Sequence, residues 1–96
     1  MATFIALLDF TDQGIRNIKD SPQRADHFNA MAERAGARVV GQYWTIGSHD
    51  GVLILEAPND EVAASVLLQL GAAGNVRSTT LRAYEWGEAQ ALVEPR

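Results

Sequence analysis

His49 and Asp50 are the neighbouring residues of this chain whose types best suit proton transfer. An imidazole on an exposed loop titrates near neutral pH, and a carboxylate beside it can orient the ring. Asp50 is followed by Gly51, however, and Asp-Gly is also typical of a hairpin turn. We favour the turn interpretation for Asp50 and keep His49 as a candidate acid–base catalyst.

A second set of side chains has the chemistry to bind an anion such as a carboxylate or a phosphate. Its members are Arg16, Asn17, Arg24 and Arg77. A guanidinium group offers a planar fork of donors to such a ligand, and Arg24 lies near the positive end of a predicted helix. The alternative, which the residues leave open, is that these groups form ion pairs that hold a loop in place. The carboxylates available for that are Asp9, Asp12, Asp20 and Asp50.

Polar and aromatic side chains alternate along two predicted edge strands. They are Tyr43, Trp44, Ser78, Thr80 and Arg82. Successive residues of a strand point to opposite faces of a sheet, so some of these side chains share one face. They either line a small-molecule cavity there or pack against a second sheet. On the same face, Arg82 is a candidate ion-pair partner of Glu56.

No metal site and no cofactor is predicted. The chain has no cysteine, and its two histidines, His27 and His49, are not spaced as a metal-binding pair. We expect His27 to be exposed to solvent. The motifs of serine hydrolases, P-loops and dinucleotide-binding folds are all missing from the sequence.

Composition indicates one small globular domain. The chain has 96 residues, of which 47% are hydrophobic and 21% charged, with a net charge of -4. An acidic protein has no general attraction to nucleic acid or anionic lipid, and no apolar run is long enough to span a membrane. We therefore expect a soluble cytoplasmic protein whose partners include neither nucleic acid nor membrane.

Hydrophobic spacing predicts four strands and two main helices. The strands cover residues 3–10, 38–46, 52–57 and 75–84, and the helices cover about 21–35 and 60–70, with a short terminal helix over 86–94. Ser21 is the predicted N-cap of the first helix, before Pro22, and Asn59 or Asp60 caps the second. The first and third strands are apolar on both faces, which indicates that both lie in the middle of the sheet.

The β-α-β-β-α-β order predicts an α+β, ferredoxin-like antiparallel sheet with strand order 4-1-3-2 and both helices on one face. The other face would leave an apolar patch exposed, which indicates an interface. We therefore expect a homodimer with two sheets packed face to face. The alternative is a monomer whose terminal helix folds across that face.

Chain direction brings three connections to one end of the sheet. They are residues 11–20, 47–50 and 71–77. Loops that converge on one end of a rigid scaffold commonly build a binding site. The site residues above therefore belong largely to one end of the molecule.

Four segments resemble the GYD-domain family over nearly the whole chain. They are TDQGIRNIKDSPQR, the hairpin after the second strand, APNDE and GNVRSTTLRAY. The resemblance implies a ferredoxin-like, dimeric α/β-barrel fold and little about chemistry. Where the family has Gly-Tyr-Asp, this chain has Ser48-His49-Asp50, so that only the aspartate matches. If the tyrosine carries an activity, His49 either replaces it or does something else.

Three functions remain open. The first is a homodimeric module that binds a small anionic ligand through Arg16, Asn17, Asp50, Arg77, Tyr43 and Arg82. The second is a small cofactor-independent enzyme of the monooxygenase or isomerase type with His49 as acid–base group, which rests on fold analogy. The third is a structural assembly unit. We favour binding, because the sequence offers no second convincing catalytic partner for His49.

Overall fold

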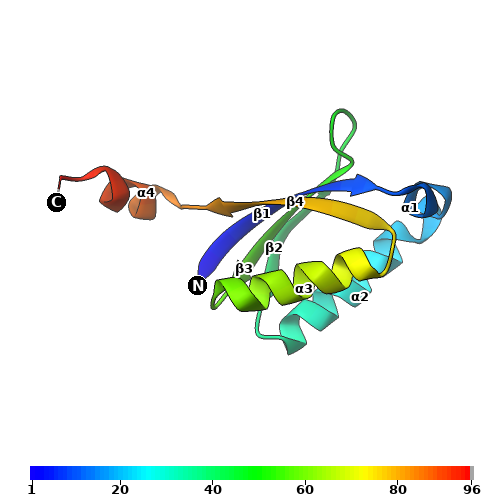
Figure 1. Cartoon of the computed structure of the whole chain (residues 1–96), viewed down its shortest axis with the longest axis horizontal. Helices are drawn as coiled ribbons and strands as arrows, with labels where there is room; N and C mark the ends of the chain where they lie inside the picture. Colours follow the sequence, from blue (N-terminus) through cyan, green and yellow to red (C-terminus); the bar gives the residue numbers. More distant parts are fainter. Residues whose placement is uncertain (96) are drawn as a thin grey trace.

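A four-stranded antiparallel sheet carries two helices on one face (Figure 1). The computed structural model describes residues 1–95. In chain order the elements are β1 (Ala2–Phe10), α1 (Asp12–Arg16), the 3₁₀ turn η1 (Ile18–Asp20), α2 (Ser21–Arg34), β2 (Arg38–Trp44), β3 (Gly51–Ala57), α3 (Asp60–Ala72), β4 (Val76–Ala83) and α4 (Trp86–Val93).

The strand order is β2-β3-β1-β4, so the predicted order 4-1-3-2 is confirmed. The two central strands, β1 and β3, are the two whose sequences are apolar on both faces. They pair in antiparallel register from Ala2 opposite Ala57 to Leu8 opposite Gly51. The helices bury one face of these two strands, and the apolar residues on the other face, such as Ile5 and Ile54, are only partly buried.

The hydrophobic core lies between the sheet and the helices α2 and α3. Its most buried large side chains are Leu53, Leu55 and Val66. On β3 every second residue from Gly51 to Ala57 is buried, which is the period of a strand with one fully covered face. Small residues such as Ala32 and Ala63 let the two helices approach the sheet closely.

The long connection after β1 is helical rather than an open loop. Thr11 begins α1 as its N-cap, since its side chain accepts a hydrogen bond from the Gly14 amide at 3.1 Å. Gly14 lies against the α3–β4 connection, where a Cβ at this position would be 1.9 Å from the Asn75 carbonyl oxygen. A glycine is required at this point because no side chain fits.

The N-terminal ends of the two main helices differ. Asn59 caps α3, with Oδ1 accepting from the Val62 amide at 2.9 Å, as predicted. The prediction that Ser21 caps α2 is wrong, because Ser21 is already the first helical residue and Asp20 precedes it without a side-chain cap. The Ser21 hydroxyl is buried instead and accepts a hydrogen bond from Trp44 Nε1 at 2.9 Å.

The face of the sheet opposite the helices is open, and we call it the open face. It carries Ile5, Leu7, Val52, Ile54 and Leu81, as the strand registers require. Helix α4 does not cover it: α4 projects beyond the end of the sheet at which β1 begins (Figure 1). All residues of α4 are exposed, so the alternative in which this helix shields the sheet is wrong.

Candidate functional site

The three predicted connections meet at one end of the sheet, as expected. The Thr11 amide donates to the Asn75 carbonyl at 3.1 Å, and the Thr11 hydroxyl donates to the Gly74 carbonyl at 2.6 Å. The β2–β3 turn joins the same end through the Asp50 amide, which donates to the Leu8 carbonyl at 2.8 Å. We call this end the loop end.

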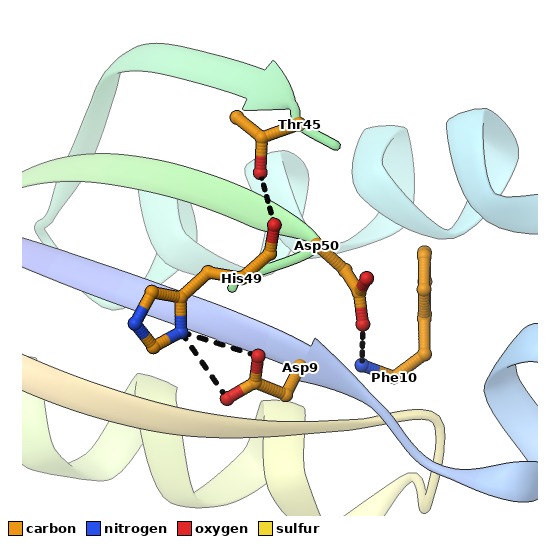
Figure 2. A network of polar contacts seen from close by, with 5 residues as sticks. All are labelled: Asp9, Phe10, Thr45, His49 and Asp50. Carbon is orange, nitrogen blue, oxygen red and sulfur yellow. Dashed lines mark hydrogen bonds and ion pairs between the residues drawn. The ribbon is translucent and has the colours of Figure 1, made fainter. Parts of the chain in front are cut away.

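His49 contacts Asp9 at the loop end (Figure 2). Its Nδ1 lies 3.2 and 3.4 Å from the two carboxylate oxygens of Asp9, a residue 40 positions earlier in the chain. In the neutral ring, an Nδ1–H that donates to Asp9 leaves Nε2 as a proton acceptor. Figure 2 shows Nε2 pointing away from Asp9. The pair thus has the geometry of a carboxylate-oriented general base.

Asp50 does not contact the imidazole. Its Oδ2 accepts a hydrogen bond from the Phe10 amide at 2.9 Å, and its carbonyl accepts one from the Thr45 amide at 2.9 Å. The Thr45 hydroxyl donates a hydrogen bond to the His49 carbonyl at 2.6 Å, which closes the turn (Figure 2). These contacts agree with the turn interpretation of Asp50.

A pocket of about 350 Å³ opens at the loop end between α2, α3 and the helix-covered face of the sheet. The apolar part of its wall includes Phe10, Phe28, Met31, Leu53 and Leu70. The polar part comprises Ser21, Arg24, His27, Gln42, Tyr43, Asp50, Gln69 and Asn75. A mostly apolar wall with a few polar groups is typical of small-molecule sites, and the volume lies at the small end of their range.

Arg24 is the most unusual polar group in this wall. Its Nη1 donates to the Asn17 carbonyl at 2.8 Å, which fixes the guanidinium. Its Nη2 is buried and has no hydrogen-bond partner among the residues that the structure describes. A buried donor without an acceptor costs free energy. An acceptor from outside the chain reaches this nitrogen only when the side chain moves, because the atom has almost no accessible surface.

The remaining predicted ligand-binding residues lie apart from one another. Arg16 is exposed at the end of α1, and the Asn17 amide group donates to the Gln13 carbonyl at 2.9 Å. Arg77 lies on the open face opposite Asp9. Arg82 is at the far end of β4, where its guanidinium stacks 4.4 Å from the Tyr84 ring centroid. Of the six, Tyr43 and Asp50 line the pocket.

Ion pairs among residues 1–95 differ from those that the sequence suggested. Arg38, rather than Arg82, pairs with Glu56, at 2.6 Å. Glu56 lies opposite Thr3 and Arg82 opposite Phe4, so the two side chains point to opposite faces of the sheet. Within the same residues, Arg16, Arg24 and Arg77 form no ion pair, so the predicted network of arginines and aspartates that would hold the loop is not formed. Asp9 pairs with His49 instead.

The described part of the chain lacks two further features. It contains no group of three histidine, cysteine, aspartate or glutamate side chains placed to hold a metal ion. None of its helices has the length and apolar character needed to cross a membrane.

The profile of the GYD domain matches residues 4–93. The chain belongs to the GYD-domain family. The match covers all four strands and both main helices, so the whole ferredoxin-like unit described above is a GYD domain.

One relative of this GYD domain carries a functional name. It is the "Glutamine synthetase and cystathionine beta-lyase binding protein" of Thermus thermophilus, which is 38% identical over 84 residues, covering 86% of this chain and 88% of the relative. Among solved structures, MtbAldR has a similar fold, with a TM-score of 0.68 at 18% identity over 88% of this chain. The region of similar fold makes up 52% of the MtbAldR chain.

Sequence reasoning missed most of the wall of this pocket. Arg24 was singled out for its charge, but no part in a site was predicted for Phe28, Met31 and Leu70. Apolar residues at helical spacing identify the buried side of a helix, and this spacing does not distinguish a core contact from a pocket wall. Asp9 was considered only as an ion-pair partner, and its contact with His49 depends on strand register.

Proposed function

We propose that this GYD domain is a homodimeric binding module that carries a small anionic ligand and docks on an enzyme of amino-acid metabolism. The observation that carries the proposal is the relative named for binding glutamine synthetase and cystathionine beta-lyase, whose match extends over 86% of this chain. At 38% identity over nearly full length, a shared type of activity is a reasonable inference.

The open face supports the homodimer. Leu81 is 49% exposed there, next to the half-buried Ile5 and Leu7 of β1. A second copy that packed its own open face against this one would remove those side chains from water. Since the interface would be the same on both copies, a two-fold dimer is the simplest assembly.

The test of enzyme docking uses purified proteins. The GYD domain is immobilised and exposed to glutamine synthetase, and separately to cystathionine beta-lyase, from its own host, with binding followed by biolayer interferometry. We expect saturable binding of at least one enzyme with a micromolar or lower Kd. A third metabolic enzyme of similar acidity from the same host serves as control. Equal signals for all three enzymes, or no signal, would overturn enzyme docking.

Catalysis is the second candidate, and the Asp9–His49 contact favours it. With Asp9 on Nδ1, the free Nε2 of His49 could take a proton from a bound substrate. Any turnover of a ligand that co-purifies with the protein would then be abolished in His49→Ala and strongly reduced in Asp9→Asn. Unchanged turnover in His49→Ala would remove His49 from the mechanism.

A purely structural assembly unit is the third candidate. The pocket of about 350 Å³ speaks against it, because an element that serves only in assembly has no need of an apolar pocket with an arginine in its wall.

A further inference from the structure

Arg24 lines the pocket as a cation that a hydrogen bond to the backbone holds in place. The bond from Nη1 to the Asn17 carbonyl, 2.8 Å long, ties the side chain to the residue that precedes η1. Nη2 is buried and has no acceptor within the described residues, so a ligand in the pocket reaches this nitrogen only when the side chain moves. No ion pair joins Arg24 to a carboxylate in this part of the chain.

The rest of the pocket wall determines what kind of molecule would bring the missing acceptor. Its wall includes Phe28 and Leu53, which are nearly fully buried, together with Leu70 and Trp44. These surfaces favour an apolar or aromatic body over a sugar or a phosphate ester. The Nε1 donor of Trp44 is already used by Ser21 at 2.9 Å, so its ring offers an apolar surface rather than a free donor.

Charge in the wall also favours an acid as ligand. Asp50 is the one carboxylate in the lining, and its Oδ2 accepts from the Phe10 amide. Arg24 and His27 are the basic groups. A carboxylate is the group that best satisfies a guanidinium, because it accepts charge-assisted hydrogen bonds in the plane of the fork.

We propose that the pocket between α2, α3 and the sheet binds a small monocarboxylic acid with an apolar or aromatic body, whose carboxylate receives hydrogen bonds from Arg24. The inference rests on the ligand-binding part of the proposed function and assigns it a place and a ligand class. The apolar body packs on Phe28 and Leu53, and a shift of the Arg24 side chain brings Nη2 to the carboxylate, which supplies the acceptor that this nitrogen lacks. The site lies on the helix side of the sheet and is therefore separate from the open face.

The first experiment compares an acid with its neutral isostere on the unmodified protein. Isothermal titration with 3-phenylpropionate and with 3-phenylpropionamide keeps the apolar body constant and changes only the charge. We expect the acid to bind about 10-fold more tightly or better, as a charge-assisted contact implies. Equal affinity, or no binding of the acid at millimolar concentration, would overturn the inference.

The second experiment changes the cation. Arg24→Gln should remove the preference for the acid over the amide, whereas Arg34→Gln, on the last turn of the same helix and exposed, should leave it intact. Circular dichroism checks that both variants fold, because Arg24→Gln also loses the bond to Asn17. If Arg24→Gln does not fold, the acid–amide comparison on the unmodified protein decides alone. An acid preference that survives in folded Arg24→Gln would overturn the role of Arg24.

The location is tested by amide chemical shifts during the same titration. Shifts should concentrate at pocket residues such as Ala25, Phe28 and Trp44 and leave the open-face residue Leu81 unmoved. Shifts confined to the open face would overturn the pocket while leaving ligand binding itself in place. Enzyme docking is measured without any small molecule, so its failure and the failure of this inference give separate results.

Discussion

The Asp50 carboxylate accepts a hydrogen bond from the Phe10 amide at 2.9 Å and so joins the β2–β3 turn to the end of β1 (Figure 2). The Asp50 amide adds a second contact, to the Leu8 carbonyl, at 2.8 Å. Asp50 therefore extends the hydrogen bonding to β1 beyond Leu8 and Gly51, the last pair of the β1–β3 ladder. The two contacts keep the turn over the loop end, where His49 meets Asp9.

Removal of the Asp50 carboxylate should destabilise the fold. In Asp50→Ala the Phe10 amide loses its acceptor, and we expect the free energy of unfolding to fall by about 1–2 kcal/mol. Urea denaturation followed by tryptophan fluorescence measures this change. Asp50→Asn keeps an acceptor oxygen and should lose less. Equal losses in both variants would mean that the hydrogen bond is not the cause.

Gly14 should be intolerant of any side chain. A Cβ at this position would lie 1.9 Å from the Asn75 carbonyl oxygen, so Gly14→Ala must displace the α3–β4 connection. We expect a loss of about 1–3 kcal/mol in the free energy of unfolding, as for other overpacked sites. Gly71→Ala is the control: a Cβ there meets nothing within 4 Å, and the helix α3 should gain about 0.5 kcal/mol. A mild Gly14→Ala variant would contradict the contact.

His49→Ala should leave the stability of the fold nearly unchanged. The side chains of His49 and Asp9 are 37% and 44% exposed, and ion pairs that water reaches contribute less than about 1 kcal/mol. Thermal unfolding of His49→Ala and Asp9→Asn at neutral pH tests this. A loss well above that value in either variant would show that the pair is structural, which would weaken the case for a catalytic His49.

Leu81→Glu should convert the proposed dimer into a monomer. Leu81 is 49% exposed on the open face, where a charge would be buried at a face-to-face interface without a partner. Size-exclusion chromatography with light scattering reports the mass of each species. Leu68→Glu, at a residue of α3 that is 73% exposed, is the matched control and should remain dimeric. A dimer that survives Leu81→Glu would place its interface elsewhere.

The fold could be predicted because its strongest signals are local. Apolar residues on both faces of residues 4–8 and 52–55 identify the central strands, and the connection rules then leave one compact topology. The predicted helix over about 21–35 also holds, since α2 ends at Arg34 and Gly36, two residues later, has a φ of 90°. Glycine adopts this conformation at little cost.

The candidate site could not be predicted to the same extent, because it depends on which face each residue shows. Arg82 and Glu56 were predicted to form an ion pair, but the strand register places their side chains on opposite faces of the sheet. Ser21 fitted the N-cap pattern, but its hydroxyl accepts a hydrogen bond from Trp44, which lies 23 residues further along the chain in β2. Such contacts between distant residues leave no periodic trace in a sequence.

The two ends of the sheet differ in whether extra sequence can be attached there without covering the pocket. Thr3 and Ala83 are register partners, so β1 begins and β4 finishes side by side, at the end of the sheet opposite the pocket (Figure 1). Extra sequence attached before β1 or after α4 would emerge away from the pocket mouth. A domain fused at either terminus should therefore leave the proposed ligand pocket open.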